Sequence, residues 1–133
     1  MTLVYADTSG LLALLNASDE YHGRAKRAFA GLREQQASLI ATSFVLVETY
    51  ALLGRRLGLD AVREFRADFA PLLDVVWVDR ALHEAGLDLM LERGRRQISL
   101  VDAVSFVVMR QKNLASALAF DAHFEEEGFS LVG

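Results

Sequence analysis

Four acidic residues of this chain lie in stretches that are otherwise largely apolar. Asp7 and Asp121 each follow a short apolar run, and Glu48 and Asp102 each lie within a segment of helical periodicity. A carboxylate is rarely buried unless it is paired or bound to a ligand, because its desolvation costs several kcal/mol. No lysine or arginine lies three or four positions from Glu48 or Asp102 to act as a local counter-ion. We therefore expect the four carboxylates to meet around a cation.

The available ligand types favour a hard divalent cation. The chain contains no cysteine, and its 3 histidines show no paired metal-ligand spacing. Oxygen ligands alone are typical of Mg²⁺ or Mn²⁺, whereas zinc sites rely on histidine and cysteine. The sequence therefore predicts a carboxylate site for Mg²⁺ or Mn²⁺.

Each acid also has a simpler structural explanation. Asp7 could cap the helix that follows it, and Ser99 with Asp102 matches the spacing of a capping box. Asp121 could initiate a turn, and Glu48 could form a salt bridge with a distant residue. Because four independent structural explanations are less economical than one shared site, we favour the functional interpretation.

The elements that position these acids alternate along the 133-residue chain. One strand is predicted to end at residue 7, and further strands are predicted at residues 38–42, 75–78, 115–120 and 129–132. Helices are predicted at residues 8–15, 20–35, 43–57, 59–73, 80–93 and 101–111. Strands separated by helices pair in parallel. We therefore expect one domain over residues 1–133, a three-layer α/β/α sandwich with a central, mostly parallel sheet of four to five strands.

The composition limits the environment and the partners. The chain is 53% apolar and 24% charged, as in globular proteins, and no segment approaches membrane-spanning length. The lack of cysteine fits a reducing compartment, so we expect a cytoplasmic protein without membrane contact. The net charge of −4 argues against nucleic-acid binding through the whole surface, but local arginines and bound cations still permit a nucleic-acid substrate.

The order of the four acids resembles the PIN-domain family, specifically the VapC-type toxin ribonucleases of toxin–antitoxin pairs. The segments that carry the resemblance are residues 4–9, 42–48, 99–106, 120–124 and 128–129. By this resemblance, Asp7, Glu48, Asp102 and Asp121 correspond to the acidic quartet of the family. The resemblance spans nearly the whole chain, and it implies a Mg²⁺- or Mn²⁺-dependent endoribonuclease with a PIN-like fold.

Supporting polar residues follow the same resemblance. Thr8 or Ser9 corresponds to a hydroxyl position beside the first acid, and Ser105 to a small polar residue one helical turn after the third. We assign helix capping near the first acid to Thr8 and Ser9. The chain departs from the family pattern at Ala119 and Val101, where relatives often carry hydroxyl residues. These departures affect the support of the acids and leave the acids themselves in place.

The predicted reaction is hydrolysis of a phosphodiester by an activated water. One or two divalent ions can activate the water, neutralise the phosphoryl oxygens and stabilise the leaving oxygen. In our hypothesis Asp7 and Asp102 bind the principal metal, Asp121 completes the metal site, and Glu48 positions or deprotonates the water. The resemblance further implies an RNA substrate, a cognate antitoxin protein and a homodimer.

Alternative functions stay open at the level of sequence. The domain could act on DNA, because the acids do not contact the 2′-hydroxyl of the sugar, or it could be a catalytically weak module that binds metal or nucleic acid. Response-regulator receivers and phosphoaspartate phosphatases also place an aspartate after the first strand. They need a second acid nearby and a lysine after a late strand, and this chain lacks both.

Residues that would hold the substrate are less clear. Arg95 and Arg96 could bind phosphates, although an exposed, solubilising loop explains them equally well. His123 could approach a phosphate, whereas His22 is interpreted as structural or exposed. Trp77 is predicted to lie in the core.

Overall fold

A five-stranded parallel sheet forms the centre of the computed structural model, which describes residues 2–132. The strands are β1 (Leu3–Ala6), β2 (Ser38–Thr42), β3 (Leu73–Val76), β4 (Ser116–Leu118) and β5 (Ser130–Val132). Their order is β3-β2-β1-β4-β5, and every neighbouring pair is parallel. The predicted parallel sheet is therefore confirmed.

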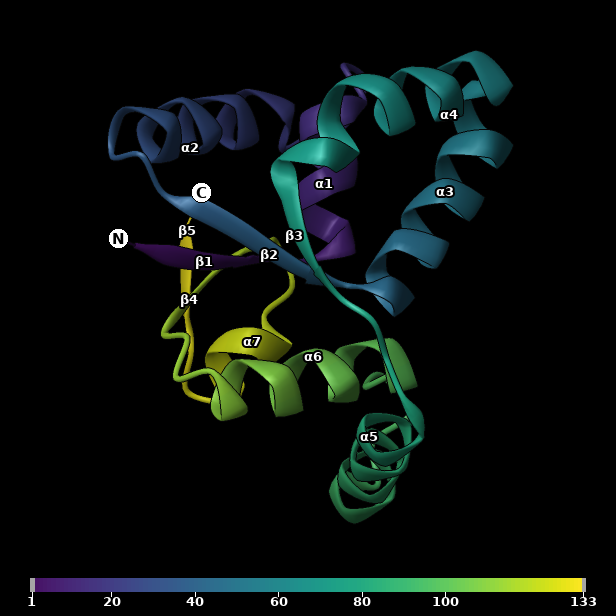
Figure 1. The fold of residues 1–133 in the computed structure, drawn as a ribbon, viewed down its shortest axis with the longest axis vertical. Helices are drawn as coiled ribbons and strands as arrows, with labels where there is room; N and C mark the ends of the chain where they lie inside the picture. Colours follow the sequence, from purple (N-terminus) through teal and green to yellow (C-terminus); the bar gives the residue numbers. More distant parts are fainter. Residues whose placement is uncertain (1, 133) are drawn as a thin grey trace.

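Helices cover both faces of this sheet (Figure 1). On one face lie α1 (Thr8–Leu15), α2 (His22–Glu34), α3 (Ser43–Leu57) and α4 (Leu59–Glu64). On the other face lie α6 (Leu100–Gln111) and the short α7 (His123–Glu126), and α5 (Arg80–Arg93) packs against α6. The predicted three-layer α/β/α sandwich is therefore confirmed, and α7 is the one of these helices that was not predicted from the sequence.

The central strand explains why the first acid lies deep in the protein. In β1, Val4 is 2% exposed and both Tyr5 and Ala6 are 0% exposed, as expected for a parallel strand covered on both faces. Gly10, in the first turn of α1, lies against the end of β4: a Cβ there would lie 2.7 Å from the carbonyl carbon of Leu118. Glycine thus allows α1 to begin directly beside the neighbouring strand.

The segment at residues 59–73 is not the single helix that its pattern predicts. After α4 it forms a π-helical turn at Phe65–Phe69 and a 3₁₀ turn at Ala70–Leu72, and β3 begins at Leu73. Pro71 lacks the N–H that an α-helix needs and fits the tighter turn. As β3 ends at Val76 rather than at residue 78, Trp77 leaves the sheet and is 74% exposed, so its predicted place in the core was wrong.

The last two strands are shorter than predicted. After Leu118 the chain leaves the sheet, because the N–H of Phe120 donates to Ser9 Oγ at 2.9 Å instead of continuing the ladder. No helix within residues 2–132 is long and apolar enough to cross a membrane. The cytoplasmic location stays a prediction.

Candidate active site

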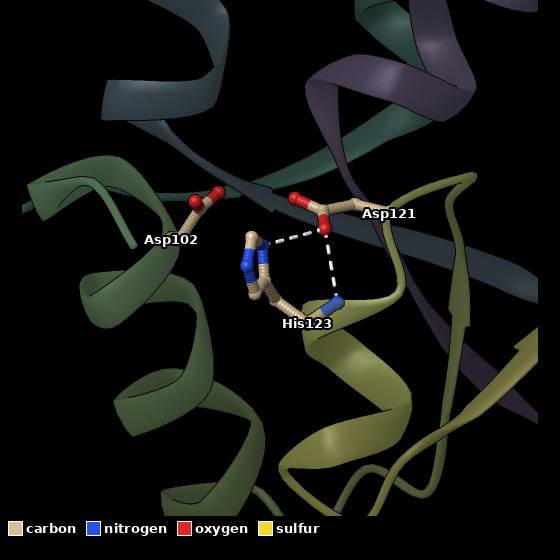
Figure 2. A group of neighbouring side chains, drawn as sticks. All are labelled: Asp102, Asp121 and His123. Carbon is tan, nitrogen blue, oxygen red and sulfur yellow. Dashed lines mark hydrogen bonds and ion pairs between the residues drawn. The ribbon is translucent and has the colours of Figure 1, made fainter. Parts of the chain in front are cut away.

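Two of the four acids lie at the carboxyl edge of the sheet. Asp7 directly follows β1 and Asp121 lies three residues beyond β4, and these two strands pair with each other. Ligand sites in parallel α/β sheets lie at this edge, just beyond the ends of the strands. Asp102, in the first turn of α6, projects toward Asp121, and the ring of His123 lies next to both (Figure 2). One ligand atom from each of Asp102, Asp121 and His123 lies within 4.8 Å of the other two.

Asp7 is buried beside two of the other acids. It is 3% exposed, and burial raises its pKa from 3.8 to about 7. The negative charges of Asp102 and Asp121 raise this pKa further, whereas hydrogen bonds from Ser9 lower it. The first acid therefore carries an electrostatic cost that a bound cation would remove.

Glu48, the fourth acid, lies near the other three through its neighbour Asp102. Burial raises the pKa of Asp102, and the charges of Asp121 and Glu48 raise it further. Glu48 lies in the second turn of α3 and is half-buried. The structure therefore brings all four predicted acids into one group, to which the sheet contributes two and the helices α3 and α6 one each.

Three of the carboxylates also make the local hydrogen bonds that the simpler explanations predict. Asp7 caps α1, because its Oδ2 accepts from the N–H of Ser9 at 3.2 Å and from Ser9 Oγ at 2.7 Å, so the assignment of capping to Thr8 and Ser9 was wrong. Ser99 and Asp102 form a reciprocal capping box.

In the same way, Asp121 Oδ1 accepts from the N–H of His123 at 2.9 Å. In each of the three carboxylates, these local bonds to the backbone use one oxygen and leave the other for a further ligand. Capping and metal binding are therefore compatible, and the caps orient the acids.

Ser9 ties two of the acids together. Its hydroxyl donates to Asp7 Oδ2 and accepts from the N–H of Phe120, which directly precedes Asp121. Thr8 is 4% exposed, and its Oγ1 is buried without a hydrogen-bond partner in the structure. Such an unsatisfied buried group is rare in native proteins, and a water or an ion that completes its hydrogen bonding is one explanation.

Ser105 has a different environment. Its Oγ donates to the carbonyl of Val101 at 3.0 Å and lies 2.6 Å from the hydroxyl of Tyr5, which therefore donates to it. Burial raises the pKa of Tyr5, so this phenol stays protonated. Ser105 thus holds α6 against β1 and positions the helix that carries Asp102.

The two arginines predicted to hold phosphates are both exposed. Arg95 Nη1 forms an ion pair with Glu126 Oε2 at 2.7 Å, and Arg96 lines a shallow hollow with Leu91 and Ile98. Within residues 2–132, no hydrogen bond or ion pair joins either arginine to the four acids. Both explanations of these two arginines, an exposed loop and a phosphate site, therefore stay predictions.

His123, which was predicted only to approach a phosphate, lies directly beside Asp121. Its Nδ1 lies 2.7 Å from Asp121 Oδ1, although the geometry is not aligned for a hydrogen bond. The position of His123, two residues after an acid that follows a strand, was the sequence feature that could have predicted this proximity. His22, by contrast, is structural, since its Nδ1 lies 2.8 Å from the carbonyl oxygen of Ala13.

The donor set fits a hard divalent cation. Carboxylates from four elements lie near one another, burial and the charges of their neighbours raise the pKa of Asp7 and Asp102, and the Oγ1 of Thr8, next to Asp7 in the sequence, is unsatisfied. Divalent ions held by such a cluster at the carboxyl edge of a parallel sheet can hydrolyse phosphodiesters, so the fold and the site fit the class of metal-dependent phosphodiester hydrolases.

Comparisons with known proteins identify the family. The PIN domain model matches residues 4–129. The 23S rRNA-specific endonuclease VapC20 of Mycobacterium tuberculosis is 37% identical over 128 residues, which cover 96% of this chain and 95% of the relative. The chain therefore belongs to the PIN-domain family, and its predicted relationship to the VapC-type toxin nucleases is confirmed.

Solved structures agree with this assignment. The crystal structure of M. tuberculosis VapC20, described as a sarcin–ricin loop cleaving toxin, matches with a TM-score of 0.84 at 36% identity and covers 95% of each chain. FitAcB from Neisseria gonorrhoeae matches with a TM-score of 0.70 at 14% identity, covering 98% of this chain and 96% of the other. The FitAcB match supports the fold alone.

Proposed function

We propose that this single domain is a Mg²⁺- or Mn²⁺-dependent endoribonuclease that serves as the toxin of a toxin–antitoxin pair. The observation that carries the proposal is the meeting of four carboxylates at the carboxyl edge of the sheet, where two of them have a raised pKa. Membership of the PIN-domain family and the identity with an endonuclease support it.

The positions of the site residues suggest a separate role for each of them. A bound divalent cation would supply charge neutralisation at the phosphate and an activated water. Asp7, Asp102 and Asp121 would bind this cation through the carboxylate oxygens that make no local hydrogen bond to the backbone. Glu48, whose charge acts on Asp102 from α3, would orient the water and accept its proton. Ser9 fixes the separation between the first and the last acid.

We further propose ribosomal RNA as the substrate. The relative that matches 96% of this chain is named for 23S rRNA, and its crystal structure is described as that of a sarcin–ricin loop cleaving toxin. The chain would therefore cut an exposed loop of a large ribosomal RNA.

The proposed partner is an antitoxin that covers an apolar groove. Leu15, Leu53, Phe65 and Phe69 line a cavity of about 250 Å³ between α1, α3 and the π-helical turn, with Glu64 and Asp68 also in its wall. An apolar segment with flanking basic residues would complement it. A homodimer is also proposed, as the family resemblance implies, and the exposed Trp77 and Val47, at 74% and 67%, are candidates for its interface. Light scattering of the purified chain measures the dimer directly.

Sequencing of RNA ends after induction in a bacterial host tests the function. The wild type should arrest growth and create new ends at defined positions in ribosomal RNA, and Asp7→Asn should do neither. Asp88→Asn, which changes an exposed acid on α5, is the matched control and should behave as the wild type. New ends in the Asp7→Asn sample, or none in the wild type, would contradict the proposal.

A further inference from the structure

Helix α2 concentrates positive charge in a chain that is acidic overall. The net charge of the chain is −4, yet this helix carries four of its 14 basic residues and one of its 18 acidic residues. All four basic side chains are exposed: Arg24, Lys26, Arg27 and Arg33. Arg24 and Arg27 line one hollow together with Ala28 and Val132. The start of α2 therefore offers a local positive surface that the net charge conceals.

This positive surface is joined to the acid group by a stack of aromatic rings. The rings of Tyr21 and Phe120 are parallel, with centroids 4.7 Å apart and an interplanar angle of 2°. The Cζ atom of Arg24 lies 5.6 Å from the centroid of Tyr21 and 5.5 Å from that of Phe120. Phe120 directly precedes Asp121, and Ser9 holds its N–H. The guanidinium is therefore fixed relative to the acids through one well-anchored residue.

A guanidinium held in this way suits a phosphate. Arginine presents a planar fork of donors that matches phosphate oxygens, and a fork already held on aromatic rings loses less entropy when it binds. Surfaces that bind single-stranded nucleic acid combine basic residues with aromatic rings in the same manner. Acidic residues also lie near this surface: Glu125 lines a hollow with Tyr21, Arg24 and Phe120, and Asp19 and Glu20 precede the helix. Between residues 21 and 33, by contrast, all four charged side chains are basic.

We propose that Arg24, held on the Tyr21–Phe120 stack and aided by Arg27, binds backbone phosphates of the RNA strand that flanks the phosphate being cut. The proposal rests on the proposed function, because it concerns the RNA substrate of that function. A strand with one phosphate at the acids would leave the site past Phe120 and cross the start of α2. The positive surface there offsets the repulsion between RNA and the four carboxylates.

Binding of a fluorescein-labelled RNA hairpin, measured by anisotropy in EDTA, tests the proposal without any need for cleavage. The hairpin carries the sarcin–ricin loop. Arg24→Ala should weaken binding about tenfold at low salt and lower the slope of log Kd against log salt by about one. Arg33→Ala is the matched control, since Arg33 is on the same helix and lies 5.8 Å from the Phe29 ring, near the opposite end of α2. It should bind as the wild type does.

Single-turnover cleavage with Mn²⁺ separates binding from chemistry. Arg24→Ala should raise the enzyme concentration needed for half-maximal rate and leave the maximal rate unchanged. Arg24→Lys keeps the charge and should keep the salt slope. Equal RNA binding by wild type, Arg24→Ala and Arg33→Ala, or equal loss in both alanine variants, would overturn the proposal. If the wild type fails to cut any RNA, the proposed function fails, while the binding comparison still decides the role of Arg24.

Discussion

Replacing Asp7 with asparagine should stabilise the protein in the absence of metal. Asp7 is 3% exposed and its pKa is raised from 3.8 to about 7, so the folded state holds its proton more tightly than the unfolded state. Between pH 4 and pH 7 the folded chain therefore binds more protons, and the free energy of unfolding falls as the pH rises. Asparagine does not ionise, and it caps a helix as well as aspartate does.

The size of the effect follows from the same pKa. A rise from 3.8 to about 7 corresponds to about 4 kcal/mol, since one pKa unit is worth about 1.4 kcal/mol. This value is an upper bound, because the buried amide of asparagine needs its own hydrogen-bond partners. For a domain of this size, an increase of 2–4 kcal/mol raises the melting temperature by about 10 °C.

Urea and thermal unfolding in EDTA, from pH 4 to pH 8, measure this difference. Wild type and Asp7→Asn should have similar stability at pH 4, and the variant should be the more stable at pH 8. Added Mn²⁺ should stabilise the wild type and narrow the gap, because a ligand of the folded state adds its binding free energy. Asp88→Asn serves as the control. A gap that does not grow between pH 4 and pH 8 would refute the assigned burial and charge of Asp7.

Three further substitutions test the positions around the site. Ser9→Ala removes the hydroxyl that holds Asp7 and should weaken Mn²⁺ binding about tenfold in calorimetry. Gly10→Ala places a Cβ against the backbone of Leu118 and should lower stability by about 3 kcal/mol in urea unfolding. Glu127, whose two arginine partners lower its pKa to about 2, contributes stability above pH 4.5 that is lost as the pH falls toward 2. Glu127→Gln should therefore cost about 1–2 kcal/mol at pH 7 and less at pH 3.

The sheet could be predicted from the sequence because its strands are short apolar runs separated by helices. The end of a strand is harder to predict, as β3 and Trp77 show. Hydropathy marks tryptophan as a core residue, but its burial depends on where the backbone leaves the sheet. At residues 59–73 the helical pattern is real, and the π-helical and 3₁₀ turns depend on tertiary packing and on Pro71.

The grouping of the acids could also be predicted, because carboxylates in apolar surroundings must find a common partner. The sequence did not show that one carboxylate can both cap a helix and belong to the acid cluster. Asp7 and Asp102 are both helix-capping residues and members of the cluster, so the structural and functional explanations do not compete. The link from Ser9 to Phe120 depends on a contact between distant segments, which spacing along the chain does not reveal.

Cleavage of purified RNA by the purified chain tests the central claim most directly. The account predicts cuts with Mg²⁺ or Mn²⁺, none with EDTA, and none by Asp7→Asn or Asp102→Asn under the same conditions. Asp88→Asn should cut as the wild type does. Cleavage that persists in EDTA or in either site variant would contradict the claim that Asp7, Asp102 and Asp121 hold the catalytic metal.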